Sequence, residues 1–250
     1  LSFAAMTPPP SPAFEVAVRA GGDAKRAYVR RMFTAIAPRY DFLNHLLSLN
    51  VDRRWRRAAV RRLGWERRPD GVYLDLCAGT LELAETLARE PRFTGRVIGA
   101  DFVVPMLERG KGKSPRTRPV AADALVLPFA DRRFDGAMVA FGVRNLADLD
   151  AGLRETYRVL RPGAGFVVLE FTTPRFAPLR AAYLFYFRRV LPAIGRAVSK
   201  HRDAYTYLPE SVLEFPDPDA LARRLGDAGF RAVRYELLSG GICALHHATR

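Results

Sequence analysis

Leu74-Asp75-Leu76-Cys77-Ala78-Gly79-Thr80 closes one apolar run of the sequence, and Val97-Ile98-Gly99-Ala100-Asp101 closes the next. Each run is typical of a buried strand, and the glycine after the first is typical of a turn into a helix. Asp101 follows Gly79 by 22 residues. An acidic side chain at that distance, at the end of the neighbouring strand, can accept hydrogen bonds from both hydroxyls of an adenosine ribose. This pair of strands therefore predicts a sheet that binds an adenosine-bearing ligand.

Short apolar runs alternate with amphipathic stretches from residue 72 onward, which is typical of a doubly wound α/β domain with a mostly parallel sheet. We expect strands at residues 72–77, 96–101, 117–122, 134–140, 164–171, 231–237 and 241–247. We expect helices near residues 82–90, 103–110, 148–159 and 218–228. Gly240-Gly241 predicts a turn between the last two strands, so that the C-terminal strand runs antiparallel.

Three segments fall outside this alternation. Residues 1–22 combine a Pro-rich stretch with neither a basic leader nor a long apolar run, which favours a disordered tail over a signal peptide. Residues 23–64 predict a lid of three helices. Residues 172–216 are rich in aromatics and prolines and predict a helical insertion that faces the substrate or a membrane. We therefore expect a single domain over residues 23–250.

The composition is that of an ordinary globular protein, with 49% apolar and 26% charged residues in a chain of 250. The two cysteines, Cys77 and Cys243, exclude a disulfide scaffold, and we expect no metal site. Arginines interrupt every apolar run before the ~18 residues that a membrane-spanning helix needs, so we expect a cytoplasmic protein.

The net charge is +14, and 36 of the 40 basic residues are arginine. Such a charge attracts polyanions, whether nucleic acid or an anionic membrane. A GC-rich genome that encodes arginine in place of lysine is an equally good explanation of the arginine excess. Charge alone therefore does not assign a function.

The loop after the first strand favours S-adenosylmethionine over a dinucleotide. Dinucleotides need several glycines and a helix N-terminus free of negative charge, whereas this loop has Gly79 alone, and Glu82 and Glu85 open the next helix. S-adenosylmethionine carries a ribose and no phosphate. The alternative is a structural turn beside a surface aspartate.

Other polar residues follow the third and fourth predicted strands. Asp123 could accept from an adenine amino group, with the backbone of Ala124 beside it. Arg144 and Asn145 follow the fourth strand at the carboxyl edge of the sheet, where ligands of such folds bind. A solvated aspartate and a helix-capping asparagine are the alternatives.

Motifs along most of the chain carry a family resemblance. They are Tyr40-Asp41-Phe42-Leu43-Asn44, Ser48, Arg53-Arg54-Trp55-Arg56, Phe141-Gly142-Val143-Arg144-Asn145, Arg158-Val159-Leu160-Arg161-Pro162-Gly163, Leu169-Glu170-Phe171, Tyr205-Thr206-Tyr207-Leu208-Pro209-Glu210-Ser211 and Gly240-Gly241-Ile242-Cys243-Ala244-Leu245-His246. On these the chain resembles the ubiquinone/menaquinone biosynthesis C-methyltransferases, UbiE or MenG, of the class I methyltransferase superfamily. The motifs span about residues 25 to 248.

The resemblance implies a Rossmann-like fold and methyl transfer from S-adenosylmethionine to a ring carbon of a prenylated quinol, giving menaquinol, ubiquinol precursors or both. The residues it places at the cofactor are Asp75, Gly79, Thr80, Asp101, Asp123, Ala124 and Ala140. Three positions depart from the family pattern. Leu81 and Asn50 stand where glycine is usual, and Ala140 stands where many members have serine. A branched side chain at Leu81 either turns away from the cofactor or weakens its binding.

Four residues are candidates for catalysis. A quinol carbon becomes a good nucleophile when its ring hydroxyl, with a pKa of ~10, loses a proton. Arg144 is predicted to stabilise the resulting phenolate, and Asn145 or Tyr205 to fix the ring by hydrogen bonding. His201, with Asp203, is a candidate for removing the proton.

A prenyl tail requires contact with a membrane. Residues 179–198 predict an amphipathic helix for anionic lipid, and the basic helix around Trp55 could join it. A core-packing helix with a solvated face is the alternative. The aromatics of this segment are Tyr183, Phe185, Tyr186 and Phe187, and its basic residues are Arg180, Arg188, Arg189 and Arg196.

Two other functions remain open on the sequence alone. A nicotinamide-dependent oxidoreductase is opposed by the single glycine and by Glu82. A catalytically impaired protein of this fold with an RNA- or membrane-binding role is favoured by Leu81 and the charge. For the enzyme we expect no nucleic-acid partner and allow for a homodimer.

Overall fold

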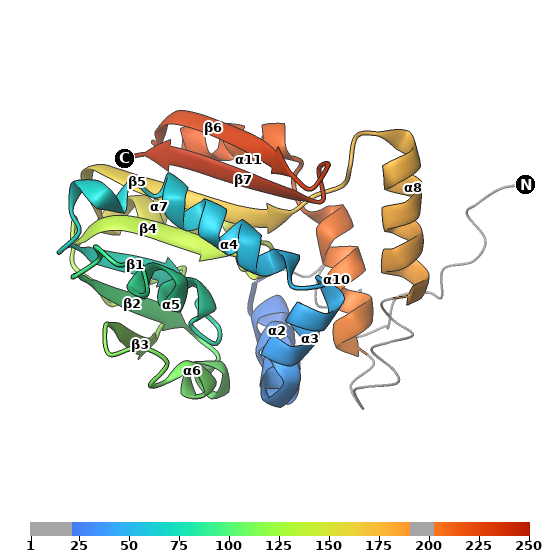
Figure 1. Ribbon diagram of the computed structural model, residues 1–250, viewed down its shortest axis with the longest axis horizontal. Coiled ribbons are helices and arrows are strands. Elements are labelled where there is room, and N and C mark those ends of the chain that lie inside the picture. The colour runs from blue at the N-terminus through green and yellow to red at the C-terminus, as the bar shows by residue number, and fades with distance from the viewer. Residues whose placement is uncertain (1–21, 191–202) are drawn as a thin grey trace, which may run out of the picture.

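A seven-stranded sheet forms the centre of the molecule (Figure 1). The computed structural model describes residues 22–190 and 203–250. The strands are β1 (Val72–Leu76), β2 (Arg96–Asp101), β3 (Thr117–Ala121), β4 (Phe134–Ala140), β5 (Leu160–Phe171), β6 (Arg231–Leu238) and β7 (Cys243–Thr249). Their spatial order is β3-β2-β1-β4-β5-β7-β6, and β7 alone among them runs antiparallel to its neighbours. This confirms the predicted fold class.

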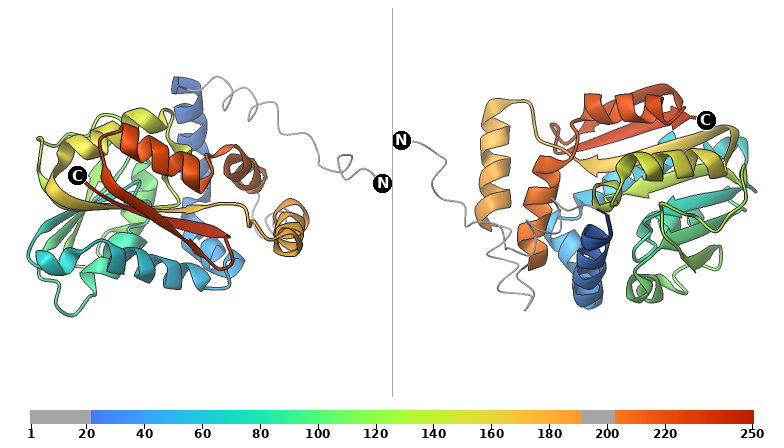
Figure 2. Two further views of the ribbon diagram at one scale, coloured as in Figure 1. Left: turned by 90° about the horizontal axis from the view of Figure 1, so that it is seen from above. Right: turned by 180° about the vertical axis from the view of Figure 1, so that it is seen from behind.

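Helices cover both faces of the sheet (Figure 2, left). They are α4 (Val51–Arg62), α5 (Glu82–Ala88), α6 (Val104–Gly110), α7 (Leu149–Val159) and α11 (Pro218–Asp227). The core is divided accordingly, since α4 and α5 bury apolar residues against one face and α7 and α11 against the other. Trp55, around which the sequence suggested a lipid-binding helix, is buried in this core together with Leu63. The apolar face of α4 is therefore not available to a membrane.

The remaining helices gather at the carboxyl edge of the parallel strands (Figure 1). They are α2 (Gly22–Ile36), α3 (Tyr40–Leu47), α8 (Ala177–Phe185) and α10 (Asp203–Glu214), with short segments η2 (Ala37–Arg39), η4 (Val143–Asn145) and the π-helical η5 (Tyr186–Val190). The short segment η3 (Trp65–Arg67) instead precedes β1, at the opposite edge. Helix α8 stands apart from the sheet, whereas α2 and α10 lie between the two (Figure 2, right). The first 21 residues of the predicted tail and the end of the predicted membrane helix lie outside the described residues.

Two local features bear on the predictions. Strand β5 begins at Leu160, four residues earlier than expected, because Leu160 already pairs with Phe134 before an irregularity in the register. Asn50 has a φ of 61°, the left-handed conformation that asparagine tolerates in place of glycine. Among the described residues, no helix combines the length and the apolar character needed to cross a membrane.

Candidate active site

The loop after β1 and the end of β2 form a cradle around one carboxylate. Asp101 accepts a hydrogen bond from the backbone N–H of Gly79 at 2.8 Å and another from that of Val103 at 2.8 Å, one on each oxygen. A carboxylate oxygen can accept two bonds, so each keeps an acceptor site for a ribose hydroxyl. Asp101 is buried, and desolvation raises its pKa. The predicted partnership of Gly79 and Asp101 is therefore present in the structure.

Asp75 lies beneath this loop and not on the wall of the cavity. Its carboxylate accepts from the backbone N–H of Ala84 at 2.9 Å, in the first turns of α5, and it is 1% exposed. Desolvation raises the pKa of Asp75 to about 8. The side chain therefore ties the start of α5 to β1 and does not face the space where a cofactor contact was predicted.

Leu81 turns away from the cradle. Its φ is 65°, and its side chain is fully buried in the apolar core under α4 and α5. The absence of a side chain at Gly99 makes room for it, because a Cβ there would lie 2.1 Å from Leu81 Cδ2. The Leu81 side chain therefore does not block the cofactor loop, which was one of the two possibilities that the sequence left open.

Replacing Leu81 with glycine should therefore lower stability more than cofactor affinity. Losing the apolar contacts lowers the free energy of unfolding by about 2–5 kcal/mol, and relieving the strained left-handed conformation raises it by about 1–2 kcal/mol. We expect a net loss of about 1–3 kcal/mol in the free energy of unfolding, measured by denaturant titration. Calorimetry should show S-adenosylmethionine affinity within about threefold of wild type, and a tighter complex would mean that Leu81 obstructs the loop.

A narrow cavity opens beside the cradle at the carboxyl ends of four strands. Its lining includes Cys77, Asp101, Asp123, Ala124 and Asn145. The predicted adenosine contacts after β2 and β3 thus face one space. It holds the Asp101 carboxylate, which suits a ribose, and Arg26, the one cation in the described lining, is paired with Asp123, which fits S-adenosylmethionine better than a phosphate-bearing ligand.

Helix α2 closes this cavity from outside. Arg26 lines it and forms an ion pair with Asp123. Lys25 Nζ donates to the carbonyls of Arg144 at 3.1 Å and Leu146 at 2.7 Å. The lid helix is therefore fastened to the loop after β4.

Helix α3 fastens to the cofactor loop in the same way. Thr80 Oγ1 donates to Asp41 at 2.5 Å, and Lys113 Nζ donates to the other oxygen of Asp41 at 2.9 Å. Thr80, predicted to contact the cofactor, thus contacts the lid in this structure. Ala140 ends β4, half-buried against the core.

A second network joins α3, α4 and α5. His45 lies 3.0 Å from Asp52 and 2.9 Å from Glu82, a spacing that could hold a metal ion. Arg56, however, pairs with Asp52 and with Glu82. Since one guanidinium already pairs with both carboxylates, this cluster is an ion-pair network that links α3 and α4 to α5.

Arg144 forms a buried ion pair that the sequence did not predict. Its NH1 donates to Glu170 Oε1 at 2.8 Å and to the carbonyl of Phe141 at 2.5 Å. Glu170 also accepts from the backbone N–H of Phe171 at 2.9 Å. Desolvation raises the pKa of Glu170, and the Arg144 charge opposes this. Glu170 therefore fixes the guanidinium in the η4 loop.

The backbone of this loop requires a glycine. A Cβ at Gly142 would lie 2.4 Å from Cys77 Cβ, at the end of β1. Asn145, three residues on, accepts a hydrogen bond from Tyr207 Oη at 2.9 Å through its Oδ1. Arg144 and Asn145 are thus held together at the edge of the cavity.

The structure does not describe the side chains of the other predicted catalytic residues. His201 lies outside the described residues, and Tyr205 and Asp203 belong to α10 with side chains that are not described. Glu170, Lys25 and Tyr207 were missed. Glu170 and Tyr207 stood inside quoted motifs, but no spacing rule links them to Arg144 and Asn145, which lie 26 and 62 positions away respectively.

The comparisons with known proteins agree on one family. The model of the ubiE/COQ5 methyltransferase family matches residues 22–250. A demethylmenaquinone methyltransferase of Thermus thermophilus is 48% identical, over 88% of this chain and 100% of its own length. The ubiquinone/menaquinone biosynthesis C-methyltransferase UbiE of Geotalea daltonii is 42% identical, over 87% of this chain and 94% of its own length.

Solved structures support the fold. A putative methyltransferase of Haloferax volcanii, in complex with the activator Trm112, has a TM-score of 0.63 at 15% identity and covers 87% of this chain and 96% of its own. A SAM-dependent methyltransferase of Thermotoga maritima has a TM-score of 0.61 at 18% identity, covering 88% of this chain and 98% of its own. At these identities the likeness shows the methyltransferase fold alone.

Proposed function

Because the chain belongs to the ubiE/COQ5 methyltransferase family, we propose that it methylates a ring carbon of a prenylated quinol in respiratory quinone biosynthesis. S-adenosylmethionine is the methyl donor. The observation that carries the proposal is the match to a demethylmenaquinone methyltransferase over that relative's whole length. The Asp101 cradle supports it, since its acceptors suit a ribose, and the cation in the described lining of the cavity, Arg26, is already paired with Asp123.

The purified chain tests this with S-adenosylmethionine labelled on its methyl group. We expect transfer to demethylmenaquinol, to a 2-polyprenyl-6-methoxy-benzoquinol, or to both. Comparing the two quinols settles which ring is preferred, and a deletion strain should accumulate the matching demethylated quinone by mass spectrometry. S-adenosylmethionine binding without transfer to either quinol would instead favour a catalytically impaired protein.

The proposed mechanism rests on electrostatics and alignment. Bound S-adenosylmethionine supplies an electrophilic methyl group. Arg144 holds a positive charge beside the ring oxygen and lowers the cost of the phenolate in a water-poor site. Glu170 keeps the guanidinium oriented, and Asn145 fixes the ring by hydrogen bonding. Tyr205 remains the alternative to Asn145 for fixing the ring, and His201, with Asp203, remains our proposed group for removing the proton.

The helices at the carboxyl edge serve as the lid in this proposal. Arg26 and Lys25 attach α2 to residues after β3 and β4, across the predicted adenosine cavity, and Asp41 attaches α3 to Thr80. Because the cavity is narrow with α2 in place, whereas α4 is packed into the core, we propose that α2 and α3, the first part of the predicted lid of residues 23–64, move outward to admit the cofactor and close over it. Residues 172–216 then form the substrate-facing side of one domain.

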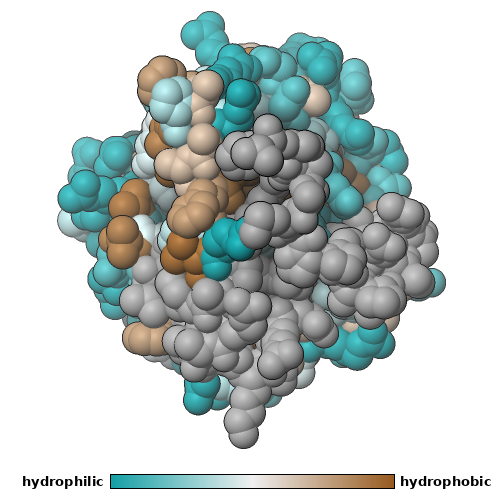
Figure 3. Space-filling model, turned by 90° about the vertical axis from the view of Figure 1, so that its right-hand side faces the viewer, coloured by the Kyte–Doolittle hydropathy of each residue, from teal (hydrophilic) through white to brown (hydrophobic). Residues whose placement is uncertain are grey.

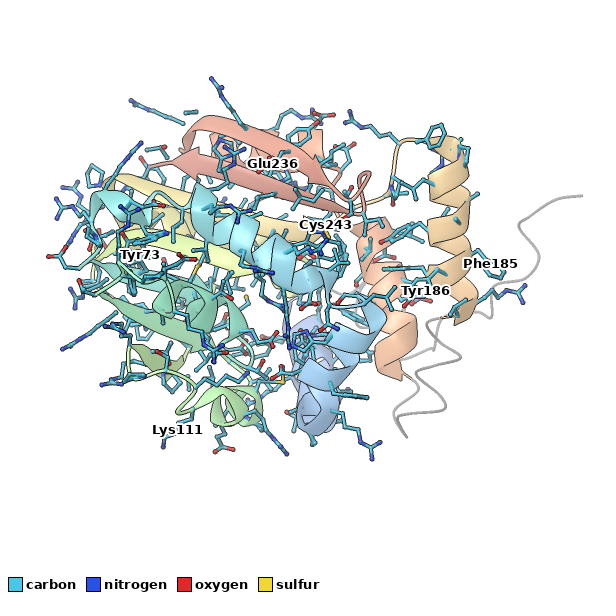
Figure 4. All side chains as sticks on the ribbon, viewed as in Figure 1. Tyr73, Lys111, Phe185, Tyr186, Glu236 and Cys243 are labelled. Atoms are coloured by element: carbon cyan, nitrogen blue, oxygen red, sulfur yellow. The ribbon has the colours of Figure 1, made fainter. Side chains whose placement is uncertain are left out.

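Membrane contact through α8 is part of the same proposal. Phe176 and Phe185 are 68% and 65% exposed, and Arg180 and Arg189 are exposed beside them. Figure 3 shows apolar side chains exposed among charged ones on the side of the molecule that carries α8. Phe185 and Tyr186 lie on opposite sides of the helix (Figure 4). Tyr183 and Phe187, also predicted for the lipid, are instead buried against the core.

Replacing Phe176 and Phe185 together with serine should reduce binding to anionic vesicles at least tenfold. Each buried phenylalanine contributes about 1.5–3 kcal/mol, and the arginines add a salt-sensitive attraction. Flotation with phosphatidylglycerol vesicles at two salt concentrations measures this. Leu237→Ser, which removes another exposed apolar residue on β6, is the matched control. If wild type, the double variant and Leu237→Ser float equally, α8 does not bind the membrane.

The partner that the family implies is the prenylated quinone substrate. A homodimer stays a prediction that sedimentation of the purified chain can test.

A further inference from the structure

Two buried hydrogen-bond donors, on Arg144 and Tyr183, lie near one aromatic residue, Phe171. Arg144 places its guanidinium carbon 5.7 Å from the centre of the Phe171 ring. On α8, Tyr183 belongs to the apolar cluster against which Phe171 packs, and its ring lies 4.3 Å from Phe187, which in turn lies 6.2 Å from Phe171. The end of β5 thus brings α8 and the Arg144 loop together.

Neither donor is satisfied within the described part of the chain. Arg144 Nε and the Tyr183 hydroxyl are both shielded from solvent, and neither has a hydrogen-bond partner there. The two residues are 8% and 6% exposed. A buried donor without a partner costs about 1–3 kcal/mol, and such groups are rare in native structures unless a ligand or water completes them.

The charges around Tyr183 explain why its hydroxyl remains a donor. Burial raises the pKa of Tyr183 far above its usual value, and the Arg144 charge opposes this only in part. Glu170 and Cys243 are the other titratable groups that act on it. The phenol therefore stays protonated at neutral pH and can donate to a ring oxygen.

We propose that Tyr183 binds the second oxygen of the quinol, across the ring from the oxygen that Arg144 faces, which makes α8 a substrate-recognition element. This rests on the proposed function. A quinol carries two oxygens at opposite ring positions, and the Arg144 and Tyr183 donors both lie at the aromatic cluster of Phe171, Phe187 and Phe141, against which a flat ring can stack. Specificity for a 1,4-diol over a simple phenol follows, because a monohydroxy ring leaves one donor unpaired.

The test uses two soluble substrates and two conservative variants. The substrates are a short-chain 2-prenyl-1,4-naphthoquinol and its monohydroxy analogue, which keeps the oxygen next to the accepting carbon and lacks the opposite one. Tyr183→Phe removes the hydroxyl and keeps the ring. Tyr186→Phe, three residues along the same helical segment, is the control.

We expect Tyr183→Phe to lower kcat/KM for the diol about five- to tenfold, the range of one neutral hydrogen bond, and to leave kcat/KM for the monohydroxy analogue unchanged. Its thermal midpoint should equal or exceed that of wild type, since no protein hydrogen bond is lost. Tyr186→Phe should match wild type on both substrates.

Other outcomes overturn the inference. An unchanged rate on the diol would show that the hydroxyl does not touch the substrate. An equal loss on both substrates would show that Tyr183 acts on the fold or on Arg144. A wild-type protein that binds S-adenosylmethionine but methylates neither compound would overturn the proposed function and this inference with it.

Discussion

Replacing Asp101 with alanine is expected to weaken S-adenosylmethionine binding at least about 100-fold. Two hydroxyls of the ribose would lose a charged acceptor, and each such hydrogen bond contributes about 1.5–3 kcal/mol. The backbone N–H groups of Gly79 and Val103 would also lose their partner. Isothermal titration calorimetry measures the affinity, and thermal unfolding shows whether the variant keeps its fold.

Asp123→Asn is the matched control in the same cavity. An amide oxygen still accepts from an adenine amino group, so we expect a loss below about tenfold. A folded Asp101→Ala protein whose affinity for S-adenosylmethionine stays within threefold of wild type would contradict the proposed role of Asp101 as the ribose acceptor.

The pH dependence of S-adenosylmethionine affinity offers an independent check. Because burial raises the pKa of Asp101, protonation should remove an acceptor, and affinity should fall at a higher pH than for an ordinary aspartate.

Replacing Arg144 with glutamine is expected to lower kcat about 100- to 1,000-fold with S-adenosylmethionine affinity within about threefold. A cation directed at a developing oxyanion in a water-poor site has an effect of this order. The adenosine contacts lie on other strands and keep their geometry. Single-turnover kinetics with a soluble quinol and calorimetry measure the two quantities separately.

The buried partner of Arg144 complicates this experiment and also supplies its control. Removing one member of the Arg144–Glu170 pair leaves a buried charge, at a cost of about 3–5 kcal/mol. The double variant Arg144→Gln/Glu170→Gln removes both charges, so it should regain stability and not activity. If activity returned with stability, Arg144 would have a structural role alone.

The sheet and the cofactor cradle could be predicted from local sequence. The alternation of apolar runs predicted the strands nearly to the residue, because strands buried on both faces are continuously apolar. Gly79 and Asp101 end adjacent parallel strands, so their meeting follows from the topology that the same pattern predicts. The Gly240-Gly241 dipeptide likewise predicted a turn before an antiparallel β7. The structure confirms this turn, in which both glycines have a positive φ.

Residues whose partners lie in distant elements could not be placed in this way. The sequence predicted Arg144 as a free cation, and the structure pairs it with Glu170. It offered Trp55 and Tyr183 as lipid-facing aromatics, and both are buried. Periodicity tells which residues share a face, but not whether that face meets solvent or another helix.

The sequence by itself determined the family, the fold class and the meeting of Gly79 with Asp101, because each depends on short-range pattern and on the ends of neighbouring strands. The tertiary structure alone decided where the side chains go. Leu81 turns into the core because Gly99 leaves space on another strand, and Tyr183 reaches the Arg144 loop because α8 packs on Phe171. Such outcomes depend on packing between segments far apart in the chain, for which local sequence carries no signal.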